Sequence, residues 1–349
     1  MACMRLLNNK VYTKDLDYVL AQHDFSPLNG KSVLVTGATG LIGSAIVDLL
    51  LRYSEYQEND IRIYIAARSA EKVEERFGMC DYLQYVPYDA LKPVNFDFHT
   101  DFIIHAASNA SPDAYMKDPV GTMMSNFLGL DNLLRYGLQC KAEKTVYISS
   151  SEVYGRKDSA GAYSEMDYGF VDLLNARSSY PMGKRASETL CASYAAQYGS
   201  SFSIARPGHV YGPTATTRDK RVSSAFAYLS AKGQDITMKS EGTQLRSYCY
   251  CVDCASAVLQ ILLYGRNGEA YNISNSSSVI TIRRMAEILA DAGNVQLLFE
   301  LPSAAEKAAF NPMDNSSLTS DKLESIGWKG LFTAEEGLSH TVNILKSFL

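Results

Sequence analysis

The chain has 349 residues, of which 46% are hydrophobic and 20% charged, and its formal net charge is −5 at pH 7. An acidic balance of this kind argues against a nucleic-acid-binding role. No apolar run reaches the roughly 18 residues that a membrane-spanning helix needs, and the first residues lack the apolar core of a signal peptide. Seven cysteines, an odd number, favour reduced thiols and a cytoplasmic location.

The first fold signal is a strand followed by a glycine-rich turn and a helix. A β-branched run over Ser32–Thr36 leads into the turn, and the apolar helical pattern SAIVDLLLRY follows it. Glycines at these positions permit a tight turn and a close backbone approach, and the helix N-terminus faces a pyrophosphate. The motif predicts a dinucleotide-binding turn made by Gly37, Thr39, Gly40, Leu41, Ile42 and Gly43.

The second strand, predicted over residues 61–68, bears on the choice of cofactor. A Rossmann fold selective for NAD usually ends this strand with an acidic residue that binds the ribose hydroxyls. Here the strand ends in Ala66, Ala67 and Arg68. Arg68 is suited to a 2′-phosphate, which favours NADP, whereas stacking on adenine would permit either cofactor. The sequence therefore leaves NAD and NADP both open.

Strand-like and helical segments continue to alternate along the chain. Strands are expected over 82–90, 101–108, 144–155 and 202–213, with an amphipathic helix over 126–138. Such alternation predicts an α/β fold of Rossmann type, with a doubly wound parallel sheet covered on both faces. Ligands bind at the carboxyl ends of such strands, so further cofactor contacts are predicted at Asp89, Ala90, Ala106, Ala107, Ser108, Pro207, His209 and Val210.

A tyrosine and a lysine one helical turn apart, Tyr180 and Lys184, carry the predicted chemistry. Residues at this spacing share a helix face. Tyrosine is a poor base at its ordinary pKa of about 10, and a nearby positive charge favours the phenolate. With Ser150 upstream, the pair forms an acid–base set for a reactive hydroxyl.

After about Tyr211 the regular alternation stops and shorter elements follow. We predict an N-terminal extension over residues 1–29, which includes a docked helix without a catalytic role. The dinucleotide-binding domain is predicted over 30–208 plus 246–275. A smaller C-terminal α/β substrate domain takes 209–245 plus 276–349.

Three cysteines in YCYCVDC raise the question of a metal site. Cys249, Cys251 and Cys254 have no second cysteine or histidine cluster to complete a ligand set. We therefore predict no metal and interpret the run as a strand, with Cys249 and Cys251 on one face, followed by a helix that starts at Asp253.

The motifs TGATGLIG, HAAS, SSSEVYG, YPMGK, RPGHVYGP and LRSYCYCVD, in this order, resemble the extended short-chain dehydrogenase/reductase family, the NAD-dependent epimerase/dehydratases that act on nucleotide sugars. Within it, NASPDAYMKDPVGTMMSN and RDKRVSSAF resemble the UDP-glucuronate decarboxylases. The resemblance implies a nucleotide-sugar substrate, a transient 4-keto sugar and a homodimer built on helices near 123–137 and 182–199.

The same resemblance implies roles at matching positions. Tyr180 would be the catalytic base with Lys184 as its partner and as a ribose contact, and both would contact the cofactor. Ser150 would bind the reacting hydroxyl, and Glu152 would assist at the carbon beside the ketone. Arg246 matches an arginine for the substrate pyrophosphate, which suits a planar guanidinium. The structural alternative for Glu152 and Arg246 is a salt bridge. Ser151 and Arg221 are further candidate substrate contacts.

Four departures from the family pattern leave the reaction open. Ser151 stands where dehydratases carry an acidic residue, which weakens a 4,6-dehydratase assignment. His209 and Ala225 each replace an asparagine that helps to hold the substrate, and Arg68 replaces the acidic residue. A decarboxylase is favoured, a 4-epimerase or dehydratase stays possible, and the alternative of another class is a non-catalytic NAD(P)-binding sensor or scaffold.

Overall fold

The computed structural model describes residues 6–57, 60–78, 80–157, 161–300, 302 and 313–349. Its centre is a seven-stranded, fully parallel sheet in the order β10-β6-β5-β4-β1-β2-β3. The order reverses between β1 and β4, as in a doubly wound Rossmann sheet, so the predicted fold class is confirmed. The strands are β1 (Ser32–Thr36), β2 (Arg62–Ala67), β3 (Leu83–Pro87), β4 (Phe102–His105), β5 (Lys144–Ile148), β6 (Phe202–Pro207) and β10 (Glu269–Ile273).

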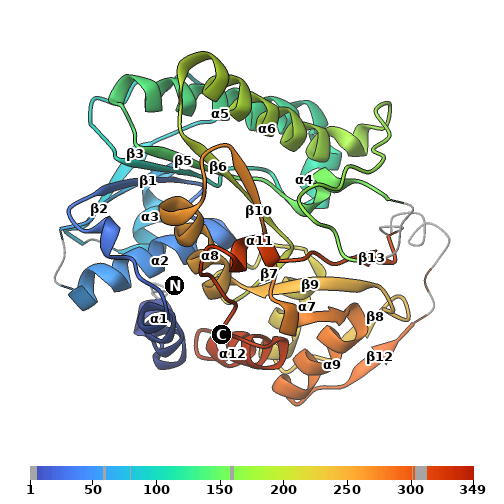
Figure 1. The fold of residues 1–349 in the computed structure, drawn as a ribbon. Coiled ribbons are helices and arrows are strands. Elements are labelled where there is room, and N and C mark those ends of the chain that lie inside the picture. Colours follow the sequence, from blue (N-terminus) through green and yellow to red (C-terminus); the bar gives the residue numbers. More distant parts are fainter. Residues whose placement is uncertain (1–5, 58–59, 79, 158–160, 301, 303–312) are drawn as a thin grey trace.

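Helices cover both faces of this sheet (Figure 1). α5 and α6 pack together on one face, whereas α2, α3 and α8 lie on the other. Within the described ranges, no helix combines the length and the apolar character that crossing a membrane requires. The helices are α2 (Leu41–Gln57), α3 (Ala70–Phe77), α4 (Pro112–Lys117), α5 (Pro119–Cys140), α6 (Ser179–Tyr198) and α8 (Cys251–Tyr264).

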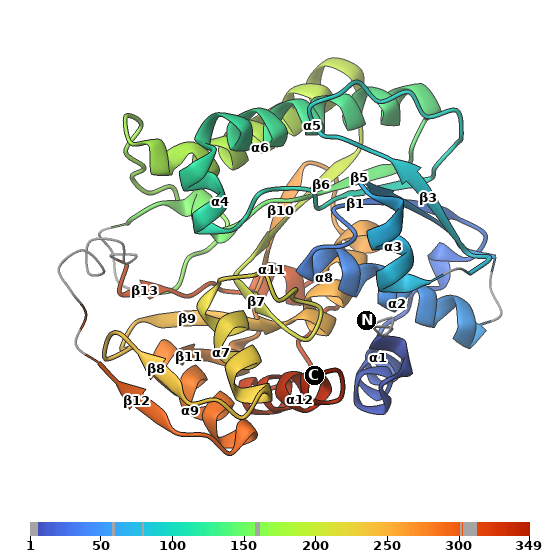
Figure 2. The same cartoon turned by 180° about the vertical axis from the view of Figure 1, so that it is seen from behind.

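A smaller set of elements packs at the carboxyl edge of the large sheet (Figure 2). β9 pairs with β7, β11 and β13, and β12 pairs with β8. Of the segment 246–275, α8 and β10 join the large sheet, while β9 belongs to the smaller one. Its strands are β7 (His209–Tyr211), β8 (Ile236–Met238), β9 (Leu245–Tyr250), β11 (Val279–Thr281), β12 (Leu297–Phe299) and β13 (Asn315–Ser316). Its helices are α7 (Val222–Ala231), α9 (Ile282–Gly293), α11 (Asp321–Glu324) and α12 (Ala334–Lys346). Short 3₁₀ turns along the chain are η1 (Leu6–Asn8), η2 (Ser26–Leu28), η3 (Ser151–Tyr154), η4 (Ala176–Ser178) and η5 (Ser276–Ser278).

The N-terminal helix α1 (Lys10–Gln22) is docked on both sets of elements. The Tyr12 hydroxyl donates to Asp48 of α2 at 2.8 Å, and both side chains are fully buried. On the other side, Tyr250 at the end of β9 donates to Asp15 at 3.0 Å. Buried, satisfied polar pairs of this kind fix how two elements sit together.

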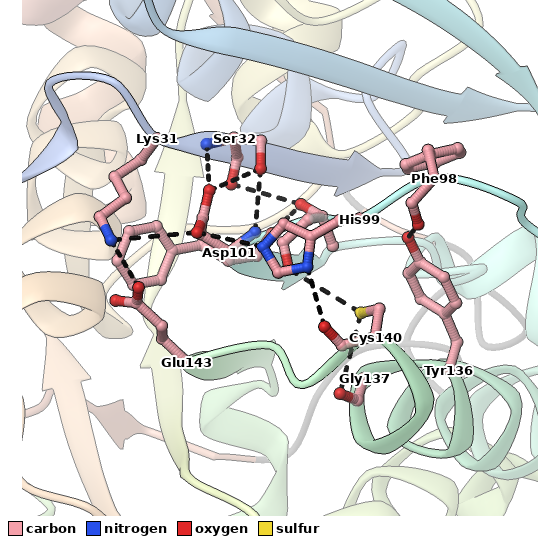
Figure 3. A network of polar contacts seen from close by, with 11 residues as sticks. Lys31, Ser32, Phe98, His99, Asp101, Tyr136, Gly137, Cys140 and Glu143 are labelled. Carbon is pink, nitrogen blue, oxygen red and sulfur yellow. Dashed lines mark hydrogen bonds and ion pairs between the residues drawn. The ribbon is translucent and has the colours of Figure 1, made fainter.

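A polar network fixes the amino-terminal edge of the sheet, the edge remote from the predicted site (Figure 3). Asp101, before β4, accepts hydrogen bonds from the backbone N–H and the hydroxyl of Ser32 in β1, at 2.7 and 2.6 Å. Lys31 pairs with Glu143 at 2.5 Å, and His99 contacts Asp101 at 3.2 Å. The network joins the starts of β1, β4 and β5, and so sets the register that aligns their carboxyl ends.

Candidate active site

The glycine turn after β1 forms a cradle that side chains would fill. Gly37 has φ +68°, and a Cβ there would lie 2.6 Å from the backbone of Ala106 and Ala107 after β4. A Cβ on Gly43 would lie 2.3 Å from the Gly37 carbonyl oxygen. A turn this close to two strand ends suits a dinucleotide pyrophosphate at a helix N-terminus. Thr39 and Gly40 complete the turn, and Leu41 and Ile42 begin α2.

The threonine at the end of β1 orders the neighbouring strand end. The Thr36 hydroxyl lies 2.7 Å from Nδ1 of His105 and accepts from the backbone N–H of Ala107 at 3.3 Å. Burial lowers the pKa of His105 to about 3, so this imidazole is neutral. The contact holds Ala106 and Ala107 against the glycine turn.

The outer end of the predicted cofactor site holds Arg68 and Asp89. Both line a hollow of about 620 Å³ beside the edge strand β3. The Asp89 carboxylate accepts from the backbone N–H of Leu91 at 3.1 Å, which shapes the turn after β3. Ala90 lies under α5, where a Cβ on Gly129 would come within 2.9 Å of it. Strand ends of this part of a Rossmann sheet are where the adenosine end of a dinucleotide is expected.

The remaining predicted cofactor contacts follow β4, end β6 or begin β7: Ser108, Pro207, His209 and Val210. The Ser108 hydroxyl donates to Asn126 of α5 at 3.0 Å. Pro207 ends β6, and His209 and Val210 begin β7. Burial, with the nearby arginine charges as a lesser cause, lowers the pKa of His209 to about 3, and its buried Nδ1 has no partner among the described residues.

Tyr180 lies at the start of α6, buried next to Ser150, Glu152 and Tyr115. Burial, and then the charge of Glu152, raise the pKa of Tyr180, while a hydrogen bond with Ser150 opposes the rise. The rings of Tyr115 and Tyr180 stack with centroids 5.3 Å apart and an interplanar angle of 14°. Ser150 caps η3 and accepts from the backbone N–H of Glu152 at 3.2 Å. The structure thus brings the predicted serine, glutamate and tyrosine together.

Lys184 lies one turn further along α6, and residues at the end of β5 fix its ammonium group. Its ammonium donates to the carbonyl of Ile148 at 2.7 Å and lies 4.6 Å from the ring centroid of Tyr147. Burial lowers the pKa of Lys184 to about 7. The expected electrostatic support of a phenolate by Lys184 is therefore weak without a ligand, because burial favours the neutral form of both groups.

A buried ion pair stands behind Lys184. Glu188, on α6, accepts from the Ser149 hydroxyl at 2.6 Å and from Arg206 of β6 at 3.0 and 2.6 Å. The negative charge of Glu188 raises the pKa of Lys184 against the effect of burial. The pair joins β5, β6 and α6 directly beneath the catalytic candidates.

The predicted substrate arginines differ in their surroundings. Arg221 precedes α7 and forms an ion pair with Asp219, and its charge lowers the pKa of Tyr180. Arg246 is buried and donates to the carbonyls of Leu245 at 2.8 Å and Met313 at 2.9 Å. Arg246 thus contacts backbone carbonyls here, and the alternative of a salt bridge with it finds no support in the described residues. Ser151 opens η3 beside Glu152.

The cysteine run is partly different from its predicted form. Cys249 lies in β9, but α8 begins at Cys251, so Cys249 and Cys251 do not share a strand face and the predicted start at Asp253 is wrong. Asp253 lies in the first turn of α8, where its carboxylate accepts two backbone N–H groups of the 331–332 segment. Cys249, Cys251 and Cys254 are all buried, which raises the pKa of each thiol. Over the described ranges no group of residues has metal-binding geometry.

Two residues near Tyr180, Tyr115 and Arg177, were not predicted from the sequence. Tyr115 stacks on Tyr180, and its buried hydroxyl has no partner in the described part of the chain. Burial raises the pKa of both Glu152 and Tyr115, and the charge of Arg177, on η4, opposes that rise. The signal in the sequence that could have identified Arg177 is its helical spacing of three residues from Tyr180.

A parallel Rossmann sheet, a glycine cradle and a Ser–Tyr–Lys set at its carboxyl edge define a nicotinamide-dependent enzyme of the short-chain dehydrogenase type. The chain belongs to the NAD dependent epimerase/dehydratase family, whose model matches residues 33–274. The family resemblance predicted from the motifs is thereby confirmed, and so is dependence on NAD or NADP.

The curated relatives include UDP-glucuronic acid decarboxylases. Decarboxylase 3 of Arabidopsis thaliana is 30% identical over 309 residues, which cover 88% of this chain and 86% of that protein. Decarboxylase 1 of Xenopus tropicalis is 27% identical over 322 residues, covering 91% of this chain and 73% of that one.

Solved structures share the fold at lower sequence identity. An epimerase of Methanothermobacter thermautotrophicus has a TM-score of 0.79 at 20% identity, covering 96% of each chain. UDP-glucose 4-epimerase of Thermotoga maritima, solved with UDP-glucose, has a TM-score of 0.76 at 21% identity, covering 91% of this chain and 99% of that one.

Proposed function

We propose that this enzyme removes CO₂ from a nucleotide-linked uronic acid, with UDP-glucuronic acid as the first candidate, through a transient 4-keto sugar. The observation that carries the proposal is the grouping of Ser150, Glu152 and Tyr180 beside the glycine cradle. Relatives of 26 to 30% identity that are named UDP-glucuronic acid decarboxylases support it.

The residues divide the chemistry as follows. The glycine cradle around Gly37 and Gly43 would hold the oxidised nicotinamide cofactor, which would supply a reversible hydride acceptor for the sugar C4. Tyr180 takes the proton of the C4 hydroxyl, which Ser150 orients, and gives it back in the last step. The C4 ketone makes the sugar a β-keto acid, so the bond from C5 to the carboxylate carbon breaks and its electrons enter the enolate. Glu152, whose pKa burial raises, holds the proton delivered to C5.

Lys184 has two tasks in this scheme. Its ammonium, whose position the Ile148 carbonyl fixes, would bind the cofactor ribose. Its charge also supports the phenolate of Tyr180, and the positive charge of the bound nicotinamide adds to that effect. Burial of both side chains keeps water away from the reacting atoms.

The test is to incubate the enzyme and NAD⁺ with UDP-glucuronic acid, and separately with neutral nucleotide sugars, and to identify products by mass spectrometry. We expect CO₂ and a nucleotide pentose. Tyr180→Phe should lower turnover by about 10²–10⁴-fold while NAD⁺ binding persists. A 4-keto-6-deoxy product without CO₂ from any uronic acid would make the enzyme a dehydratase, and exchange at C4 of a neutral sugar alone would make it an epimerase.

We also propose that the enzyme is a homodimer in the cytoplasm. Four side chains of α5 remain 40 to 71% exposed although they are large and apolar: Val120, Met123, Met124 and Phe127. An apolar helix face beside α6 suits pairing with the same face of a second copy. Light scattering of the parent should give twice the chain mass, and Met123→Glu with Phe127→Glu should give the monomer. Free thiols at all six described cysteines fit a reducing compartment.

A further inference from the structure

Arg177 lies at the rim of the space around Tyr180. η4 runs directly into α6, so Arg177 and Tyr180 stand three residues apart on a continuous helical path and share a face. η4 also packs against α4, which carries Tyr115, and the Tyr115 ring stacks on Tyr180. Two elements therefore place the Arg177 side chain on the same side of the site as Tyr115 and Glu152.

The guanidinium of Arg177 acts electrostatically on Glu152 but forms no direct contact with it among the described residues. No ion pair or side-chain hydrogen bond joins its guanidinium to another described residue, and the residue is half-buried. The other two site arginines are engaged, Arg221 by Asp219 and Arg246 by backbone carbonyls. A half-buried guanidinium with five free donors favours a planar, bidentate anion such as a carboxylate.

A second donor without an acceptor lies in the same place. The Tyr115 hydroxyl is buried and unpartnered, while its residue is only 1% exposed. A buried donor left unpaired is costly, and native structures usually supply its acceptor through a ligand or water. The two donors and the neighbouring Glu152 thus surround a position that suits an oxygen-rich group of the substrate.

We propose that Arg177 determines specificity for acidic sugars by binding the carboxylate of the uronic acid. This inference rests on the proposed function and refines it. Arg177 binds the group that is lost as CO₂, while Tyr180 works on the neighbouring C4. Neutral nucleotide sugars lack that group, so Arg177 contributes nothing to their binding, and its charge separates the two substrate classes.

The test compares Arg177→Gln with Lys117→Gln, a matched control that removes an exposed positive charge at the end of α4. Calorimetry on the NAD⁺-loaded enzyme measures affinity for UDP-glucuronic acid and for UDP-glucose. A charged hydrogen-bonding contact is worth about 10- to 100-fold in affinity. We expect Arg177→Gln to lose that much for the acidic ligand, with less than about a two-fold change for the neutral one, and Arg177→Lys to recover part of the loss.

The outcomes separate this inference from the proposed function. If the parent makes no CO₂ and binds both ligands equally, the proposed function fails. If the parent releases CO₂ but Arg177→Gln binds the acidic ligand as the parent does, or loses both ligands equally, the role of Arg177 is refuted. A rise in KM for the uronic acid with kcat nearly kept supports it, because uniform binding of the carboxylate affects KM.

Discussion

Replacement of Glu188 by glutamine tests how the buried framework supports the site. The Glu188 and Arg206 side chains are only 12% and 6% exposed, and the carboxylate accepts three hydrogen bonds from Ser149 and Arg206. Glu188→Gln keeps the shape but removes the charge. The guanidinium of Arg206 then keeps two neutral partners, the Tyr154 hydroxyl at 3.1 Å and the Glu165 carbonyl at 2.9 Å.

The expected loss of stability follows from burial. Removing one partner of a buried ion pair costs about 3–5 kcal/mol, because the other charge stays buried without compensation. Glutamine retains one acceptor oxygen for Arg206, so the lower end, about 3 kcal/mol, applies. A surface pair provides the control: Glu269 and Lys322, whose side chains are 44% and 32% exposed, contribute about 0–1 kcal/mol.

The same substitution changes the titration of Lys184. The pKa of Lys184 is about 7 because it is buried, and the charge of Glu188 raises it. Without that charge the pKa falls, so the loss of activity that follows deprotonation of Lys184 begins at a lower pH. The lowered pKa of Lys184 also makes the stability of the fold depend on pH. Between about pH 7 and the unfolded pKa of about 10.4, the unfolded chain binds more protons, so the free energy of unfolding increases as the pH rises.

The assay is urea unfolding at fixed pH, followed by circular dichroism and by the fluorescence of Trp328, which is 1% exposed. Glu188→Gln should unfold at clearly lower urea than the parent, whereas Glu269→Gln should match the parent. The pH dependence of kcat is then measured for each. Equal midpoints for the two variants, or an unshifted pH profile in Glu188→Gln, would refute the reasoning from burial.

Two further predictions concern the cofactor. Gly43→Ala should weaken NAD⁺ binding by more than about tenfold, because its Cβ would lie 2.3 Å from the Gly37 oxygen and displace the cradle; calorimetry checks this, and parental affinity would contradict it. Arg68→Ala should weaken NADP⁺ much more than NAD⁺ if Arg68 binds a 2′-phosphate, and equal losses for both would leave Arg68 as a packing partner of adenine.

Much of the framework was predictable because it follows local patterns. The strand at Ser32–Thr36 has the predicted bounds, since a β-branched run between polar and glycine residues leaves little choice. The predicted helix 126–138 is the inner part of α5, which starts at Pro119 because Asp118 caps it by accepting from the backbone N–H of Gly121. The alternation of strands and helices along the chain also predicted that the carboxyl ends of the strands would line one edge of the sheet.

The electrostatics of the site were not predictable from spacing. The pair Tyr180 and Lys184 suggested a stabilised phenolate, but spacing says nothing of how deeply both groups are buried, and burial has the larger effect on each pKa. Tyr115 and Arg177 were missed for a related reason. Tyr115 reaches Tyr180 through the packing of α4, which is a long-range contact without a local pattern, and the meaning of Arg177, close in sequence to Tyr180, depends on the same packing of η4 against α4.

The N-terminal segment, expected to have no catalytic role, connects the two halves of the site. Tyr12 bonds to Asp48 of α2, the helix that follows the glycine cradle. Asp15 accepts from Tyr250 at the end of β9, the strand that carries Arg246, and contacts His340 of α12 at 3.0 Å. Because buried, satisfied contacts resist rearrangement, α1 fixes the distance between the cradle and Arg246, the proposed substrate arginine. The relative placement of the proposed cofactor and substrate residues therefore depends on contacts made by α1.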